Sequence, residues 1–247
     1  MSNLELSEIV IYPVKSCAGV SLPRVGLDRF GPSGDRRWLV VDDRGDFLTQ
    51  RRLPAMALLR ARWDGAGLRL QSGDSGMDVP VPVAGSGRRA VQIWGEQVAA
   101  DDAGDTAASW LSRQLGLECR LVYMADDVVR PVDSDYASGG ETVGFADGFP
   151  LLLISQASLQ DLNSRLGYEV PMNRFRPNLV VSGCEAFAED SWRRIRIGDL
   201  EFEVAKPCSR CVIPSIDQAT ANKDPAINRV LASYRRVDGK VYFGQNL

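Results

Sequence analysis

Apolar residues recur at two different spacings along this 247-residue chain, and the spacing separates the predicted strands from the predicted helices. Strands are expected where short apolar or alternating runs end in turn residues. In the first half these runs cover 6–11, 37–41, 46–49, 58–63 and 68–70, with exposed turns over 71–90 around a short strand at 79–83. In the second half they cover 151–154, 179–181 and an alternating hairpin at 194–204. Most of the regular structure is therefore expected to be strand.

Three other segments repeat their apolar residues at helical spacing, and each has a recognisable beginning or end. The expected caps and stops are Asp105 with Gly116, Ser155 with Gly167, and Asp224 followed by Pro225. Proline in the first turn after an aspartate favours a helix start, because its missing N–H is not needed there. The apolar faces of these helices are most simply interpreted as core.

Composition is that of an ordinary folded protein, with 45% hydrophobic and 25% charged residues. A net charge of −3 argues against a general affinity for nucleic acid or anionic membranes. The sequence shows neither a secretory signal nor an apolar run long enough for a membrane helix. Its five unevenly spaced cysteines do not resemble a disulfide framework, so a reducing cytoplasm is expected. Arginine pairs such as Arg51-Arg52 could still serve an anionic small molecule.

Two thiols, Cys208 and Cys211, lie three residues apart in the segment KPCSRC, in a chain with no histidine. Neighbouring cations favour the thiolate, which is both a metal ligand and a nucleophile. Without imidazole, the usual general base and the commonest zinc co-ligand are missing. A thioredoxin-like dithiol would open a helix, whereas residues 212–214 are expected to be extended on a loop that leaves a strand. Zinc, dithiol and buried-core interpretations remain open from these residues alone.

Three more polar clusters flank predicted strands: YPVKSC at 12–17, GDRRW at 34–38 and NRFRPN at 173–178. Each one taken singly is most simply a solvated or salt-bridged strand end. Together they supply Lys15, Arg36 and Arg176 with hydroxyl and amide donors. Such a set would suit a phosphate and a polar ring system.

Seven separated motifs follow one another along the chain: YPVKSC, GDRRWLVV, FADGFP with SQASLQDLNSRLG, NRFRPNLVVSG, AEDSW, KPCSRC and FGQN. In this order they resemble the MOSC family, and in particular its two-part members, which include the mitochondrial amidoxime-reducing component and its bacterial counterparts. The resemblance implies a mainly β fold with α+β elements. An N-terminal MOSC-type β-barrel over 1–121 would pack on a MOSC β-barrel with peripheral helices over 122–247. Because family members usually continue further, the last strand of the second domain is expected to be missing.

The resemblance also implies a pterin-based molybdenum cofactor (Mo-molybdopterin) in the cleft between the halves. Cys211 would be the protein thiolate on molybdenum, with Cys208 as its neighbour and Asp147 as a catalytic acid close to the metal. The other implied cofactor contacts are Lys15, Ser16, Arg36, Arg176, Asn178, Ser209, Arg210 and Asn246. A soft sulfur donor suits molybdenum, and basic groups would neutralise the pterin phosphate.

The implied activity is the molybdenum-dependent reduction of N-hydroxylated substrates such as N-hydroxy bases, hydroxylamines or amidoximes. Electrons would come from an external ferredoxin- or flavin-type reductase, and a proton from Asp147 or an ordered water. No nucleic-acid scaffold and no membrane partner is expected. Two alternatives remain: a non-catalytic cofactor-binding or sulfur-carrier module, and a dithiol redox protein that uses Cys208 and Cys211.

Overall fold

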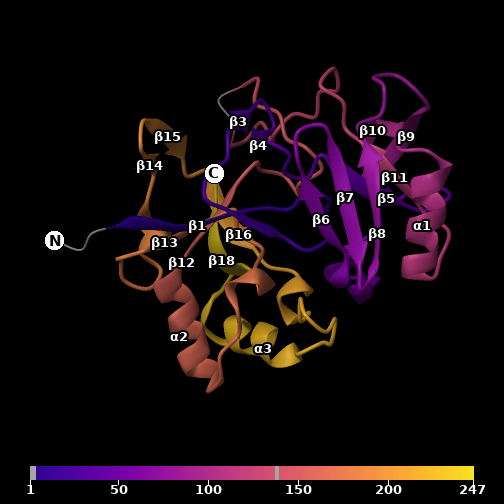
Figure 1. The fold of residues 1–247 in the computed structure, drawn as a ribbon. Helices are drawn as coiled ribbons and strands as arrows, with labels where there is room; N and C mark the ends of the chain where they lie inside the picture. Colours follow the sequence, from indigo (N-terminus) through magenta and orange to yellow (C-terminus); the bar gives the residue numbers. More distant parts are fainter. Residues whose placement is uncertain (1–3, 137–138) are drawn as a thin grey trace.

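The computed structural model describes residues 4–136 and 139–247, and its elements confirm the mainly β class (Figure 1). The strands are β1 (Glu5–Ile11), β2 (Val20–Leu22), β3 (Leu27–Asp28), β4 (Gly31–Pro32), β5 (Trp38–Val41), β6 (Arg60–Trp63), β7 (Gly67–Ser72), β8 (Ser75–Pro80), β9 (Arg88–Ile93), β10 (Glu96–Asp102), β11 (Arg120–Tyr123), β12 (Leu152–Ser155), β13 (Leu179–Ser182), β14 (Arg194–Ile197), β15 (Leu200–Glu203), β16 (Lys206–Ser209), β17 (Arg236–Val237) and β18 (Lys240–Asn246). The α-helices are α1 (Asp105–Leu115), α2 (Gln156–Leu166) and α3 (Pro225–Tyr234). None of the helices in these ranges is long and apolar enough to cross a membrane.

The largest sheet joins the beginning and the end of the chain. Its strand order is β16-β18-β12-β13-β1-β2, with β17 attached to β18. Neighbouring strands are antiparallel except β12 and β13, which are parallel and joined through α2, as a parallel pair requires a crossover. Strand β1 pairs with β13 through Ile9 and Leu179, so an N-terminal strand lies in a sheet built mainly from the C-terminal half. The division at 121/122 stays a prediction.

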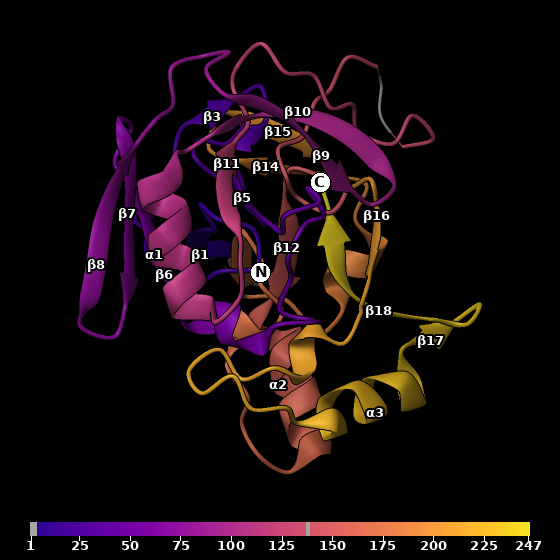
Figure 2. The same cartoon turned by 90° about the vertical axis from the view of Figure 1, so that its right-hand side faces the viewer.

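Two further sheets and α1 form most of the rest of the N-terminal half, together with the short β3–β4 pair. One sheet has the order β5-β11-β10-β9, the other β6-β7-β8, and Figure 2 shows α1 beside both. Side chains of β5 alternate between two cores: Trp38 and Val40 pack with the residues of α1 and β6–β8, Leu39 and Val41 with those of β9–β11. All four are buried, because both faces of this strand are covered.

The helix ends follow their sequence signals closely. Side-chain caps at Ser155 and Asp224 and left-handed glycine stops at Gly116 and Gly167 are all present. The cap predicted at Asp105 is wrong by one residue. Gly104 is the N-cap, and Asp105 is the first helical residue, where its carboxylate accepts a hydrogen bond from Arg120.

Two strand predictions need correction. Residues 71–78 do not form exposed turns: β7 continues to Ser72, and β8 adds a third strand from Ser75 to Pro80. This strand forms because Met77 and Val79 alternate onto the core that α1 covers. The segment 46–49 forms no strand of its own but two isolated bridges, from Phe47 to Val41 of β5 and from Asp46 to Gln92 of β9.

Candidate functional site

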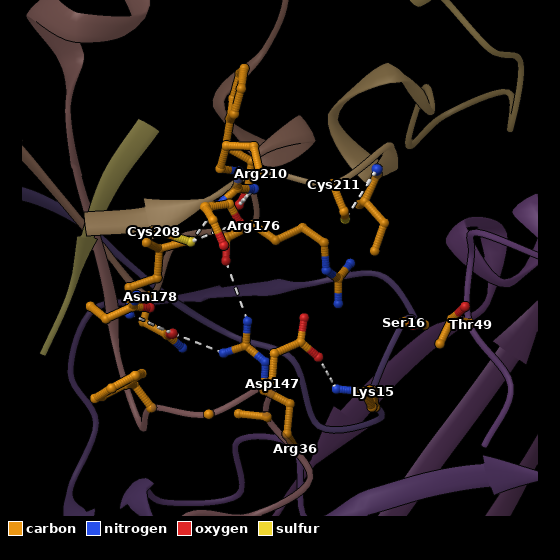
Figure 3. A pocket seen from close by; sticks show the side chains of 18 of the residues that line it. Lys15, Ser16, Arg36, Thr49, Asp147, Arg176, Asn178, Cys208, Arg210 and Cys211 are labelled. Atoms are coloured by element: carbon orange, nitrogen blue, oxygen red, sulfur yellow. Dashed lines mark hydrogen bonds and ion pairs between the residues drawn. The ribbon is translucent and has the colours of Figure 1, made fainter. Parts of the chain in front are cut away.

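A cleft of about 830 Å³, partly open to solvent, is lined by residues from both halves of the chain (Figure 3). All ten site residues predicted from the sequence line it: Lys15, Ser16, Arg36, Asp147, Arg176, Asn178, Ser209, Arg210, Cys211 and Asn246. They come from segments that are far apart in the sequence. The fold therefore brings the predicted residues together, while the role of each stays a prediction.

Strand ends of the large sheet place most of these residues. Lys15 and Ser16 follow β1, residues 176–178 precede β13, and Asn246 lies in β18. The sequence suggested that the KPCSRC segment is a loop. This is only partly right, because Lys206–Ser209 form the edge strand β16, which pairs with β18. Proline at the second position is tolerated there because an edge strand has one unpaired side. Beyond it, Ile213–Ser215 form a short 3-10 helix where extended chain was expected.

Three of the lining residues have a left-handed backbone, which is uncommon outside glycine. The φ angles are 66° at Ser16, 44° at Arg36 and 57° at Arg176. The backbone at Arg36 is held from both sides, since its N–H donates to the Tyr12 carbonyl at 2.8 Å and its carbonyl accepts from Phe145 at 2.7 Å. Strained backbone that neighbours hold in place is a common feature of functional sites. The backbone of these lining residues is therefore fixed by the fold before any ligand binds.

The guanidinium groups of Arg36 and Arg176 both lie on the ring of Tyr12, at 4.4 and 4.2 Å from its centroid. The ring is buried, and its hydroxyl donates to the Pro177 carbonyl at 3.0 Å. Arg176 also donates to the carbonyl of Cys17 at 2.7 Å. Burial lowers the pKa of Arg176 to about 10, so it stays a cation at neutral pH.

Asn178 links Arg36 to two strands of the large sheet through its side-chain amide. Its side-chain oxygen accepts from Arg36 at 2.8 Å and from the backbone N–H of Leu152 at 3.2 Å, and its NH₂ donates to the Val10 carbonyl at 3.0 Å. The residue is only 1% exposed. Its amide thus connects β1, β12 and Arg36. On the other side, Asp35 pairs with Arg36 at 2.6 Å; burial raises the pKa of Asp35, and Arg36 opposes that rise.

Lys15 reaches the cleft as a buried cation. The residue is 5% exposed, and its ammonium group donates to the Phe145 carbonyl at 2.7 Å and to the Asp147 carboxylate. Burial lowers the pKa of Lys15 to about 8, against the opposing effect of Asp147. Lys15 is therefore an acid that titrates close to physiological pH.

Asp147 has the opposite property. Its carboxylate also accepts from the indole N–H of Trp94 at 3.1 Å and lies 3.5 Å from the guanidinium of Arg51. Loss of water around the carboxylate raises its pKa, but Lys15 and Arg51 outweigh that effect and hold the pKa well below its usual range. Asp147 is ionised at neutral pH in this arrangement, which suits a fixed counter-charge better than a proton donor.

The two thiols of the KPCSRC segment have different partners. The sulfur of Cys211 accepts from the backbone N–H of Ile213 at 3.5 Å, and its carbonyl accepts from Asn228 of α3 at 2.8 Å. The sulfur of Cys208 instead accepts from the guanidinium of Arg210 at 3.1 Å. Both are free and partly exposed. The two sulfurs therefore have different hydrogen-bond partners in the same cleft, while the role of each stays a prediction.

The cleft wall is strongly cationic. Among the described residues that line it, the basic side chains are Lys15, Arg36, Arg51, Arg176 and Arg210, against Asp147 as the acidic one. The Nε atom of Arg210 is also buried without a hydrogen-bond partner. Within residues 4–136 and 139–247, no three His, Cys, Asp or Glu side chains group closely enough to hold a metal. The cationic wall therefore fits an anionic group.

Comparison with known proteins agrees with the order of the motifs. Residues 3–118 match the model of the MOSC N-terminal beta barrel domain, and residues 140–247 match that of the MOSC domain. Mitochondrial amidoxime-reducing component 1 of Mus musculus is 35% identical, with 94% of this chain and 72% of that protein covered. The Homo sapiens protein of the same name is 34% identical, with the same coverage.

The chain belongs to the MOSC family. The resemblance inferred from the motifs is thereby confirmed. A molybdenum cofactor sulfurase of Oryza sativa subsp. japonica is 31% identical to this MOSC protein, over 99% of this chain and 32% of the rice protein. The relatives of this chain thus include amidoxime-reducing components and a molybdenum cofactor sulfurase.

Some residues of the cleft in this MOSC protein were not predicted. They include Thr49, Arg51, Phe149 and Phe175. Arg51 had a weak signal as one half of an arginine pair, but nothing local connects it to Asp147. Asn228 likewise shows no motif, because its contact with the backbone of Cys211 depends on how α3 packs.

Proposed function

We propose that this MOSC protein binds a molybdenum cofactor in the cleft and reduces N-hydroxylated compounds there. The observation that carries the proposal is the convergence of Cys211 and a strongly cationic wall on one cleft, in a chain similar to amidoxime-reducing components. The bound cofactor would supply a two-electron centre that accepts oxygen. The reaction converts an N–OH group, two electrons and two protons into N–H and water. A ferredoxin- or flavin-type reductase would deliver the electrons.

The residues of the cleft would serve as metal ligand and as contacts for the cofactor. Cys211 would be the protein ligand of the metal. Arg36 and Arg176, stacked on Tyr12, and Arg210, with its free Nε, would hold the anionic and polar parts of the cofactor.

Lys15 is better placed than Asp147 to give a proton to the departing oxygen. Its ammonium group has three hydrogens, and two of them point at Phe145 and Asp147. The anionic Asp147 keeps Lys15 protonated and oriented.

A second candidate is a cofactor-binding or sulfur-carrier module without turnover. The observation in its favour is the match to the rice molybdenum cofactor sulfurase across nearly the whole chain. Such a module would use the same cleft and the same cations. It would bind molybdenum but reduce no substrate.

One experiment distinguishes the two candidates. The protein is loaded with cofactor, its molybdenum content is measured, and benzamidoxime reduction is followed with reduced methyl viologen as electron donor. Reductase activity supports the first candidate, and molybdenum without activity supports the second. Failure to retain molybdenum would exclude both.

Three cysteine variants test the ligand assignment in the same assay. Cys211→Ala should lose activity, while Cys184→Ala, which lies outside the cleft, should keep it. Cys208→Ala is expected to keep molybdenum. Full activity in Cys211→Ala would contradict the assignment of Cys211.

A further inference from the structure

Trp94 occupies a backbone position that a tryptophan rarely takes. With Gly95 it forms the two-residue turn between β9 and β10, where Ile93 pairs with Glu96. The φ angles are 52° at Trp94 and 85° at Gly95. A turn with two left-handed residues favours asparagine followed by glycine, because a bulky side chain is strained there. A strained aromatic residue at such a position suggests a function beyond making the turn.

The contacts of Trp94 lead to the edge of the cleft. Its indole N–H donates to the Asp147 carboxylate at 3.1 Å, and the guanidinium of Arg51 lies 4.5 Å from its ring. Phe47 meets the indole edge-on, with 5.0 Å between the ring centroids. Trp94 nevertheless remains 45% exposed. The indole is therefore oriented by three neighbours and still offers surface to a ligand.

The same hairpin also holds the loop that carries Asp147. Glu96, directly after the turn, pairs with Arg130 at 2.8 Å, and Arg130 donates to the carbonyls of Gly144 and Ala146 at 2.9 and 2.7 Å. The tip of the β9–β10 hairpin and the loop at 144–147 thus form one connected unit. A ligand that touches Trp94 would lie beside the reacting part of the cleft.

A second cavity, of about 1140 Å³ and open to solvent, lies on this side of the hairpin. Trp94 and Phe47 contribute aromatic surface to it, and it shares Thr49 and Arg51 with the cofactor cleft. Its charged side chains have both signs, since Asp46 lines it together with Arg51 and Arg52. The cavity therefore favours a flat apolar group over a ligand of one particular charge.

We propose that this second cavity binds the planar part of the substrate, with Trp94 as the surface on which a conjugated ring stacks. The inference rests on the proposed reductase function and names its preferred substrates as planar N-hydroxylated compounds. A ring on Trp94 would direct its N–OH group past Thr49 and Arg51 towards Asp147 and Lys15. Saturated compounds with the same N–OH group would lack the stacking contact.

A matched pair of substrates tests this. Benzamidoxime and cyclohexanecarboxamidoxime carry the same reacting group on a flat and on a saturated ring. The ratio of their kcat/KM values is measured for the cofactor-loaded wild type and for Trp94→Phe and Trp94→Asn. Asparagine suits the turn, so Trp94→Asn should fold well while it removes the aromatic surface. Trp192→Phe, outside both cavities, is the control.

The expected result is a fall of about tenfold in the planar-to-saturated ratio for Trp94→Asn, since one ring contact is lost. Trp94→Phe keeps a ring and should keep most of the ratio, as should the control. If Trp94→Asn slows both substrates equally, Trp94 only orients Asp147 and the proposal is wrong. An unchanged rate with both substrates would overturn it as well.

Fluorescence gives a readout that does not depend on turnover. Benzamidoxime should quench the tryptophan emission of the wild type with saturation and more strongly than its cyclohexane counterpart, and Trp94→Asn should abolish the difference. If the wild type reduces neither compound but shows this quenching, the proposed reductase function fails while the planar subsite stands. Equal quenching by both compounds, or none, would remove the subsite whatever the activity.

Discussion

The ammonium group of Lys15 donates a hydrogen bond to the carboxylate of Asp147, which lies 132 positions later in the sequence. Lys15 follows a strand of the N-terminal half, and Asp147 lies in the loop between β11 and β12. Each changes the ionisation of the other: Asp147 helps Lys15 to stay charged despite burial, and Lys15 keeps Asp147 ionised. The pair therefore connects the two halves and defines the acid–base state of the cleft.

We expect Asp147→Asn to shift the alkaline side of the pH–activity profile to lower pH. Activity that needs the Lys15 ammonium is present below its pKa of about 8 and is lost as the pH rises through that value. The charge of Asp147 raises this pKa, so its removal should lower the pKa further. The measurement is kcat between about pH 6 and pH 10.

Asp43→Asn, at an exposed position in a turn, is the matched control and should leave the profile in place. An unshifted alkaline limb in Asp147→Asn would show that Lys15 does not control it. Labelling of the Lys15 amine in cofactor-free protein, followed by mass spectrometry, reports the same pKa without turnover.

Tyr12 should matter through its ring more than through its hydroxyl. Tyr12→Phe keeps the surface between Arg36 and Arg176 and loses one hydrogen bond, at a cost of about 1 kcal/mol. Tyr12→Leu removes both cation–ring contacts and should cost about 3 kcal/mol or more. Urea unfolding measures the two free energies. Similar losses in both variants would mean that the hydroxyl is the important group.

Asp102 should contribute more to stability than an ordinary surface carboxylate. Its side chain is 7% exposed and accepts from Arg120 at 2.6 Å, from the N–H of Gly104 at 2.7 Å, and from Arg89. Asp102→Asn should lower the free energy of unfolding by about 2–3 kcal/mol. The exposed pair of Arg69 with Asp78 provides the comparison, since Asp78→Asn should cost less than about 1 kcal/mol.

The contribution of Asp102 also has a definite pH dependence. Burial raises its pKa, but Arg120 and the other donors outweigh this, so the folded-state pKa is lowered. The stabilisation is therefore present above the unfolded pKa of about 3.9 and is lost as the pH falls through the folded value. Urea unfolding of the wild type and of Asp102→Asn should converge towards low pH. A constant difference between them down to acid pH would contradict this account.

Gly144 lies directly against the strained backbone of Arg36. A Cβ atom at Gly144 would be 2.8 Å from the Arg36 carbonyl oxygen, which is backbone and cannot turn away. Gly144→Ala should therefore cost about 1–3 kcal/mol and displace Arg36 in the cleft. At Gly26 an added Cβ meets nothing within 4 Å, so Gly26→Ala should stay within about 0.5 kcal/mol of the wild type. Equal unfolding midpoints in urea would count against a close contact at Gly144.

Much of the local structure of this protein follows from short-range patterns in its amino-acid sequence. Helix starts at Ser155 and Asp224 were predictable because a capping side chain binds an N–H only two or three residues away. The strand predicted at 37–41, observed as β5 over Trp38–Val41, was evident from its apolar run. The ordered motifs also identified the family and ten of the residues that line the cleft, because similarity to known proteins carries information that periodicity does not.

How these residues act on one another depends on long-range contacts that the folded chain creates. Three contacts of the site join segments that no local pattern relates. They are the hydrogen bond of Trp94 to Asp147, the ion pair of Asp147 with Lys15, and the hydrogen bond of Asn228 to the Cys211 carbonyl. They depend on β1 pairing with β13 and on where α3 packs, and such long-range pairing leaves no trace in local spacing. Asp147 could be predicted as an acid of the site, but its ionised state follows from the cations that the fold places around it.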